Sequence, residues 1–147
     1  MSAKILIVGN GGREHALTWA LRQSPQVDEI LIASGNAGTA QIGQNVDISP
    51  EDITALVKFA DEHRFDLVVI GPEVPLSLGL ADELKKIGLR VFGPIQASAQ
   101  IESSKAFAKG LMVKKNIPTA AYAEFSDEAS ARAYLQTCQH PVVVKAD

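Results

Sequence analysis

The chain has 147 residues, of which 46% are hydrophobic and 21% are charged, as in an average soluble globular domain. This composition excludes a disordered tail, a collagen-like chain and a highly charged repeat. The net charge of −3 offers no cationic excess to attract nucleic acid or an anionic membrane. No apolar run approaches the ~20 residues that span a bilayer. A strand-like run already begins at Ile5, which argues against a signal peptide and favours a cytoplasmic location.

Short apolar runs rich in β-branched residues alternate with segments of helical spacing in the first part of the chain. The runs predict strands at residues 5–8, 30–33, 46–48, 67–70 and 90–92. The segments between them predict helices over residues 13–23, 53–60 and 76–87, the second capped by Ser49 and the third ended by Gly88. We also expect Trp19, on the first of these helices, to pack in the core. Strands of this kind are typical of parallel sheets covered on both faces. The sequence therefore predicts an α/β fold with an open, doubly wound, Rossmann-like parallel sheet.

After Phe92 the pattern changes. Residues 97–116 predict two helical pieces that meet near Ser103 and Ser104, and residues 126–139 predict another helix. Two further strands are predicted, at residues 121–125 and 141–146. We expect a first domain over residues 1–104 and the incomplete beginning of a second over residues 105–147, because the last strand has no partner after it.

The clearest candidate site is a loop between the first predicted strand and the first helix. Its glycines let the backbone turn tightly and approach a ligand, and the helix N-terminus offers unpaired N–H groups to a phosphate. The alternative is a tight turn that binds nothing. A dinucleotide fingerprint would require glycine at Glu14 and an acid near Ser34, and these two departures argue against a nicotinamide cofactor. The residues of this first loop are Gly9, Asn10, Gly11, Gly12 and Arg13.

Two more loops should lie beside the first, because the carboxyl ends of parallel strands meet at one edge of a sheet. Glu73, on a loop stiffened by proline, is suited to holding hydroxyls or an amine. Asn36 and Thr39 can donate hydrogen bonds to a sugar or a phosphate, although both also suit ordinary turn chemistry. The second loop comprises residues 34–39 and the third comprises residues 71–76. The binding candidates on them are Asn36, Gly38, Thr39, Gly71, Pro72 and Glu73.

Other reactive side chains give weaker signals. His15 is a minor candidate for a general base, and Cys138, the single cysteine, is expected to be a packing residue. Lys145 lies in an apolar predicted strand and must point to a polar partner such as a phosphate. The sequence shows no clustered metal ligands, so we assign neither a metal site nor a catalytic residue to this chain.

The order of the motifs resembles that of the phosphoribosylamine–glycine ligase (glycinamide ribonucleotide synthetase) family over the whole chain. Ser34 departs from the family, which usually has proline before Gly-Asn-Ala-Gly-Thr. The motifs that carry the resemblance are Gly9-Asn10-Gly11-Gly12-Arg13-Glu14-His15, Gly35-Asn36-Ala37-Gly38-Thr39, Gly71-Pro72-Glu73-Val74-Pro75-Leu76, Phe92-Gly93-Pro94, Ser103-Ser104-Lys105-Ala106-Phe107 and Val144-Lys145-Ala146-Asp147.

The resemblance implies an ATP-grasp ligase of de novo purine biosynthesis, which joins glycine to 5-phosphoribosylamine through a glycyl phosphate and releases ADP and phosphate. It implies ATP with magnesium (or manganese) as cofactors, and places Lys105 and Lys145 near the nucleotide phosphates. The metal ligands would lie outside this chain, and the fragment alone should be inactive. Partners would be small molecules only, with no nucleic acid or membrane, and the protein a monomer. A nucleotide-linked oxidoreductase and a non-enzymatic module that binds a phosphorylated sugar remain the alternatives.

Overall fold

The computed structural model describes residues 2–146, which form two compact units that meet between Ala99 and Gln100. The first unit is built on a five-stranded sheet in the order β3-β2-β1-β4-β5, and every neighbouring pair is parallel. This confirms the predicted α/β fold. Because the chain adds strands outward on one side of β1 and then on the other, the strand order switches between β1 and β4. The strands are β1 (Ala3–Gly9), β2 (Val27–Ser34), β3 (Gln44–Val46), β4 (Leu67–Ile70) and β5 (Val91–Phe92).

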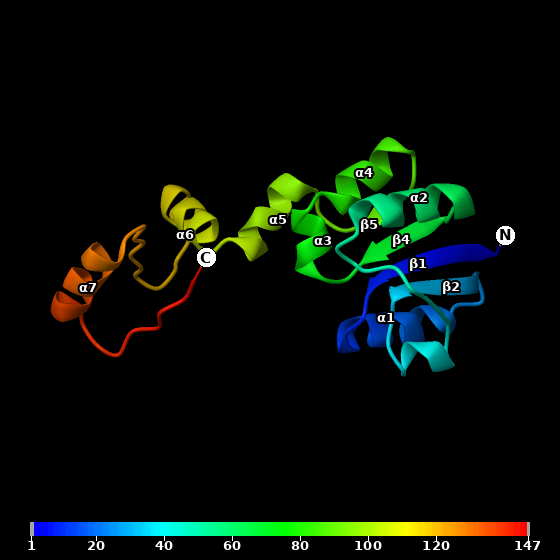
Figure 1. Ribbon diagram of the computed structural model, residues 1–147, viewed down its shortest axis with the longest axis horizontal. Helices are drawn as coiled ribbons and strands as arrows, with labels where there is room; N and C mark the ends of the chain where they lie inside the picture. The colour runs from blue at the N-terminus through cyan, green and yellow to red at the C-terminus, as the bar shows by residue number, and fades with distance from the viewer. Residues whose placement is uncertain (1, 147) are drawn as a thin grey trace. The chain divides into compact units, whose positions relative to one another are not determined.

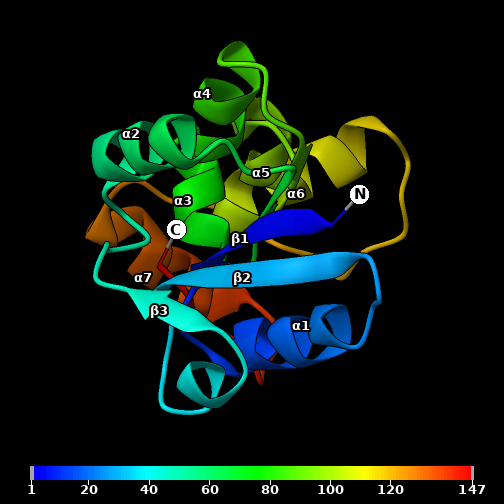
Figure 2. The same ribbon diagram turned by 90° about the vertical axis from the view of Figure 1, so that its right-hand side faces the viewer.

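Helices cover both faces of this sheet. Helix α1 lies on one face, and α2, α3 and α4 lie on the other (Figures 1 and 2). Side chains of β1 alternate between these layers, as the pleat requires: Leu6 packs into the core beneath α2 and α4, and Ile7 into the core beneath α1. The helices of the first unit are α1 (Gly12–Arg22), the short η1 (Thr39–Gln41), α2 (Ile53–His63), α3 (Glu73–Ser77) and α4 (Leu80–Lys86).

Several details of this unit differ from the sequence prediction, among them the third strand, which was expected at residues 46–48 and lies at Gln44–Val46. The helix expected over residues 76–87 is two helices, because Gly79 takes a φ of +89° and separates α3 from α4. The cap of α2 is Asp52, whose carboxylate accepts a hydrogen bond from the N–H of Ala55 at 2.9 Å, and not Ser49. Trp19 is 60% exposed and not in the core, because Thr18 and its neighbours one turn away occupy the buried side of α1. Gly88 follows α4 with a φ of +83°, as predicted for a helix end.

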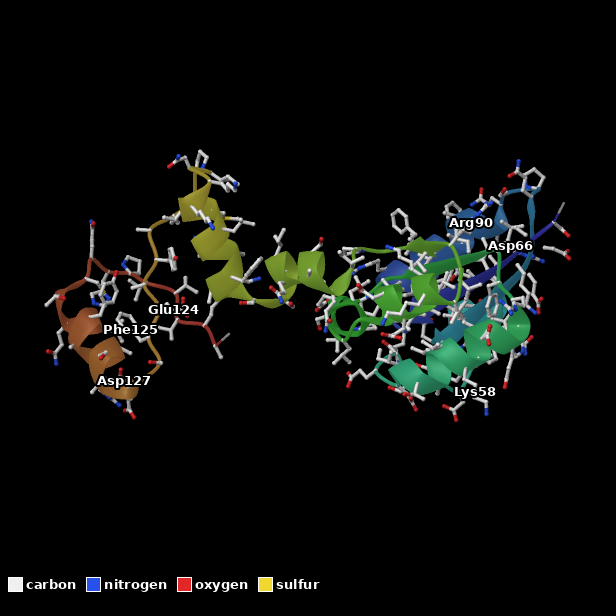
Figure 3. All side chains as sticks on the ribbon, turned by 90° about the horizontal axis from the view of Figure 1, so that it is seen from above. Lys58, Asp66, Arg90, Glu124, Phe125 and Asp127 are labelled. Carbon is white, nitrogen blue, oxygen red and sulfur yellow. The ribbon has the colours of Figure 1, made fainter. Side chains whose placement is uncertain are left out.

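The second unit is helical. The predicted break near Ser104 is confirmed, since its hydroxyl caps α6 by accepting a hydrogen bond from the N–H of Phe107 at 3.0 Å. Near the start of α7, the ring of Phe125 lies 5.2 Å from the ring of Tyr134, and Asp127 caps the helix (Figure 3). The remaining helices are α5 (Gln96–Ser103), which crosses the division between the units, α6 (Lys105–Lys114) and α7 (Glu128–Thr137).

The two strands predicted in the second unit are wrong. Residues 121–125 and 141–146 form no strand, and Val143 is 83% exposed. A strand is held by hydrogen bonds to a neighbouring strand, and residues 100–146 of this structure contain no strand that could pair with either segment. Across residues 2–146, no helix has the length and apolar character needed to cross a membrane.

Candidate functional site

The first loop turns at the carboxyl end of β1 and leads directly into α1. Gly9 ends the strand with a φ of +128°, a backbone conformation that residues other than glycine rarely adopt. Gly11 precedes the helix with an ordinary φ of −93°, and its N–H donates to Oε2 of Glu14 at 2.7 Å. The next N–H groups, of Gly12 and Arg13, belong to the first helical turn and have no partner within the helix. These two groups are donors that the first loop can offer to an anion.

Glu14 is the residue of this region whose role the sequence analysis missed. Its side chain is only 4% exposed and fills the space between the ends of β1 and β4. A Cβ on Gly9 would lie 2.7 Å from Cγ of Glu14, and a Cβ on Gly71 would lie 2.6 Å from its Cδ. Both positions therefore require glycine so that this carboxylate fits. In the sequence, Glu14 stood out only as a departure from the dinucleotide fingerprint.

The third loop is tied to the first. The guanidinium of Arg13 donates a hydrogen bond from Nη1 to the carbonyl oxygen of Gly71. The N–H of Gly71 donates in turn to the carbonyl oxygen of Val8 at 3.1 Å. Residues 73–76, predicted as part of the third loop, are the beginning of α3, so the loop itself is short and Glu73 is the first helical residue. Glu73 is half-buried, and within residues 2–146 its carboxylate has no hydrogen-bond or ion-pair partner. Glu73 is thus available to a ligand at this edge of the sheet.

The second loop docks onto the first through the Asn36 side chain and through a backbone hydrogen bond from the N–H of Gly35 to the carbonyl oxygen of Gly9 at 3.1 Å. Nδ2 of Asn36 donates to the carbonyl oxygens of Asn10 at 3.0 Å and Gly11 at 3.1 Å. Oδ1 of Asn36 accepts from the N–H groups of Gly38 at 2.8 Å and Thr39 at 3.0 Å. Thr39 is completely buried. The polar groups of Asn36 and Thr39 therefore hold the loops in shape, and neither side chain is a free donor for a ligand.

Asn45, on β3, completes this arrangement, and no sequence motif contained it. Its Nδ2 donates to the carbonyl oxygen of Asn36 at 2.8 Å, and its Oδ1 accepts from the hydroxyl of Thr39 at 2.7 Å. Asn45 precedes the strand predicted at residues 46–48, and no sequence pattern marked it as an inward-pointing side chain.

Two hollows of the first unit lie at the opposite, amino edge of the sheet. One is lined by Asp66 and Arg90, which precede β4 and β5 (Figure 3). The other is lined by residues near the start of β2 and β3, among them Asp28 and Gln44. None of the predicted binding residues lines either hollow. The three loops instead form a rim at the carboxyl edge of the sheet, where ligands of open α/β sheets bind.

The two predicted nucleotide-binding lysines lie in the second unit. Lys105 begins α6, and its ammonium group donates to the carbonyl oxygen of Glu102 at 3.3 Å. Lys145 is exposed on the segment before the C-terminus. Lysine ammonium groups suit phosphate oxygens. Within residues 2–146, no group of three or more acidic, histidine or cysteine side chains could hold a metal ion.

Models of known families match both parts of the chain. The N domain of phosphoribosylglycinamide synthetase matches residues 3–102, and the ATP-grasp (A) domain of the same protein matches residues 103–147. The chain belongs to the phosphoribosylglycinamide synthetase family. The predicted resemblance is thereby confirmed.

Relatives of the phosphoribosylglycinamide synthetase family match almost the whole chain. It is 54% identical to the phosphoribosylamine–glycine ligase of Allochromatium vinosum over 146 residues, and 51% identical to that of Vibrio cholerae over 146 residues. Each match covers 98% of this chain and 34% of the relative. The chain thus spans about a third of the curated relatives that it matches.

Solved structures give the same family and the same fold. A phosphoribosylamine–glycine ligase from Thermotoga maritima is 33% identical, with a TM-score of 0.58 over 80% of this chain and 26% of that one. The N5-carboxyaminoimidazole ribonucleotide synthetase from Thermotoga maritima is 18% identical, with a TM-score of 0.66 over 90% of this chain and 36% of that one. The second match shows the fold alone.

Proposed function

We propose that the full-length protein carrying this chain joins glycine to 5-phosphoribosylamine and consumes ATP, in de novo purine biosynthesis. The observation that carries the proposal is the match to phosphoribosylamine–glycine ligases at about half identity across 98% of the chain. In this reaction the glycine carboxylate takes the γ-phosphoryl group of ATP and ADP leaves. The amine of the ribosylamine then attacks the carbonyl carbon of the glycyl phosphate, and inorganic phosphate leaves as the amide bond forms.

The first unit binds 5-phosphoribosylamine on the rim formed by the three loops. The N–H groups of Gly12 and Arg13 face the phosphate, because they are unpaired within the helix and stand at the positive end of the α1 dipole. Glu73 accepts hydrogen bonds from the ribose hydroxyls or the amine, because its carboxylate has no partner within residues 2–146. The remaining residues of the site shape the rim: Gly9, Asn10, Gly11, Asn36, Gly38, Thr39, Gly71 and Pro72.

The second unit supplies part of the nucleotide site. The domain boundary expected at residues 104 and 105 puts Lys105 and Lys145 in the ATP-grasp region, where their ammonium groups neutralise phosphate oxygens. Magnesium or manganese, when bound with ATP, withdraws charge from the phosphoryl group in transfer. Residues 2–146 offer lysines for the phosphates and no cluster of carboxylates for the metal, so its ligands come from the rest of the protein. We place the protein in the cytoplasm as a monomer that contacts small molecules only.

The test is an assay of the purified full-length protein. ADP release that requires both glycine and 5-phosphoribosylamine, with equal formation of glycinamide ribonucleotide, supports the ligase. Calorimetry with NAD addresses the oxidoreductase alternative. Tight NAD binding, or ADP release that does not depend on glycine, would contradict the proposal.

A further inference from the structure

Asn45 uses both ends of its amide group to fix the second loop. Its Nδ2 donates to the carbonyl oxygen of Asn36 at 2.8 Å, and its Oδ1 accepts from the hydroxyl of Thr39 at 2.7 Å. The same hydroxyl oxygen accepts from the N–H of Asn36 at 2.7 Å. Asn45 itself lies on β3, which pairs with β2 in the sheet. One side chain on a strand of the sheet therefore holds two points of the second loop.

The second loop is shaped to receive this side chain. Gly35 has a φ of +73°, and a Cβ at this position would lie within 2.8 Å of Nδ2 of Asn45. Only glycine satisfies both the backbone conformation and the close approach. The loop conformation and the position of Asn45 are thus matched to each other.

The effect of Asn45 extends to the first loop through Asn36. The Asn36 side chain donates to the carbonyl oxygens of Asn10 and Gly11, next to the first turn of α1. Its orientation depends on the backbone of Asn36, which Asn45 holds at the carbonyl oxygen. A continuous series of hydrogen bonds therefore connects β3 to the loop proposed to bind phosphate.

We propose that Asn45 is a positioning residue for the phosphoribosylamine site, which acts through Asn36 and does not touch the substrate. The inference rests on the proposed function for the identity of the ligand. The hydrogen bonds of Asn45 keep Asn10 and Gly11 in the conformation that leaves the next two N–H groups open to an anion. Order imposed before binding lowers the cost of binding, since the loop entropy is already lost.

Asn45→Ala removes both hydrogen bonds, and Asn45→Asp keeps the shape but removes the donor to Asn36. In the full-length protein we expect each variant to raise the KM for 5-phosphoribosylamine roughly ten-fold, the order expected for losing one or two neutral hydrogen bonds. The KM for ATP should stay within about two-fold of the parental value, which corresponds to a free-energy change smaller than that of one hydrogen bond. Gln44→Ala is the matched control, because Gln44 is the exposed neighbour of Asn45 on β3, and it should behave like the parent.

Hydrogen–deuterium exchange of the peptide covering residues 34–46 separates this inference from the proposed function. Faster exchange in both Asn45 variants, and not in Gln44→Ala, supports the positioning role, since the N–H groups of Gly38 and Thr39 lose their ordered acceptor. Unchanged exchange, or a KM for ATP that rises as much as the KM for 5-phosphoribosylamine, would overturn the positioning role. Parental kinetics in Asn45→Asp would also overturn the positioning role, because the shape of the side chain would then be enough to hold the loop without its hydrogen bond to Asn36. A parent protein without ligase activity would instead refute the proposed function, while the exchange rates still decide the role of Asn45.

Discussion

The side chain of Glu14 fills the space that a side chain at position 71 would need, at the junction of α1 with the sheet. The carboxylate of Glu14 lies against the backbone of Gly71, where a Cβ would approach to 2.6 Å of its Cδ. Glu14 is 4% exposed, and its Oε2 accepts the N–H of Gly11 at 2.7 Å. The end of β4 and the start of α1 are therefore fitted to one another by a single buried carboxylate.

Gly71→Ala should destabilise the first unit, because the added methyl group overlaps the Glu14 side chain. The expected loss in the free energy of unfolding is about 1–3 kcal/mol, as for other overpacked sites. Denaturant unfolding of the chain measures it. Gly12→Ala is the control, since no atom lies within 4 Å of a Cβ there, and it should leave stability unchanged or higher. If the clash is the cause, Gly71→Ala should cost much less in a Glu14→Ala background, and equal costs in both backgrounds would contradict the explanation.

Gly11→Val should abolish binding of a phosphorylated ribose while the sheet stays folded. A glycine can be required by a positive φ or by the close approach of a ligand, and the φ of −93° at Gly11 leaves only the second reason. Valine can adopt this backbone, but its side chain would crowd the space in front of the first helical turn, 3.0 Å from Oε2 of Glu14. Calorimetry with ribose 5-phosphate measures the loss, and circular dichroism checks the fold. Parental affinity in a folded variant would mean that the loop is only a turn.

Most of the first unit could be predicted from the sequence because its strands are buried on both faces. In apolar runs such as residues 67–70 every residue is hydrophobic, as burial on both faces requires, and the glycines after the runs mark the strand ends. The positions of the three loops followed from the parallel arrangement alone. The split between α3 and α4 could not be predicted in this way, because the positive φ of Gly79 interrupts an otherwise continuous apolar stripe.

The internal contacts of the site were beyond sequence reasoning for a different reason. Asn36 and Thr39 are polar turn residues, and their residue types suit a ligand as well as they suit each other. Only the distances show that Asn36 bonds to Asn10 and that Thr39 is buried. Likewise, the pattern at residues 141–146 indicated a strand, but pairing depends on a second segment that no local pattern specifies.

The N-terminus of α7 should respond to acid through its cap. The pKa of Asp127 lies below its ordinary value of 3.8, mainly because the N–H of Ser130 donates to the carboxylate at 2.9 Å and favours the charged form. Because the pKa is lowered in the folded state, the stabilisation of α7 by this cap is present above pH 3.8 and is lost as the pH falls through the pKa of the folded protein. The amide shift of Ser130 in NMR spectra should therefore titrate at low pH. Asp127→Asn keeps an accepting cap that does not ionise, so a titration that persists in this variant would contradict the assignment.

Glu73→Gln should raise the KM for 5-phosphoribosylamine in the full-length protein and leave the KM for ATP nearly unchanged. The amide keeps the shape of the side chain at the start of α3 and removes the charge that would accept hydrogen bonds from hydroxyls or an amine. Losing one charge-assisted hydrogen bond corresponds to an increase of roughly ten-fold or more. An equal change in both KM values would indicate a folding role instead. Glu83→Gln is the control, since Glu83 pairs with Lys86 on the exposed side of α4, away from the three loops.

The isolated chain should bind a phosphorylated ribose weakly and should neither bind Mg-ATP detectably nor release ADP. The three loops that form the rim all lie within residues 9–76, and their mutual hydrogen bonds are complete within the first unit. Phosphoryl transfer needs the nucleotide held together with a metal, and residues 2–146 bring lysines to that task but no group of three metal-binding side chains. Calorimetry with ribose 5-phosphate and with Mg-ATP compares the two sites in one sample. Tight binding of Mg-ATP, or ADP release that depends on glycine, would show that the nucleotide site lies within this chain and that the assignment of Lys105 and Lys145 to an incomplete site is wrong.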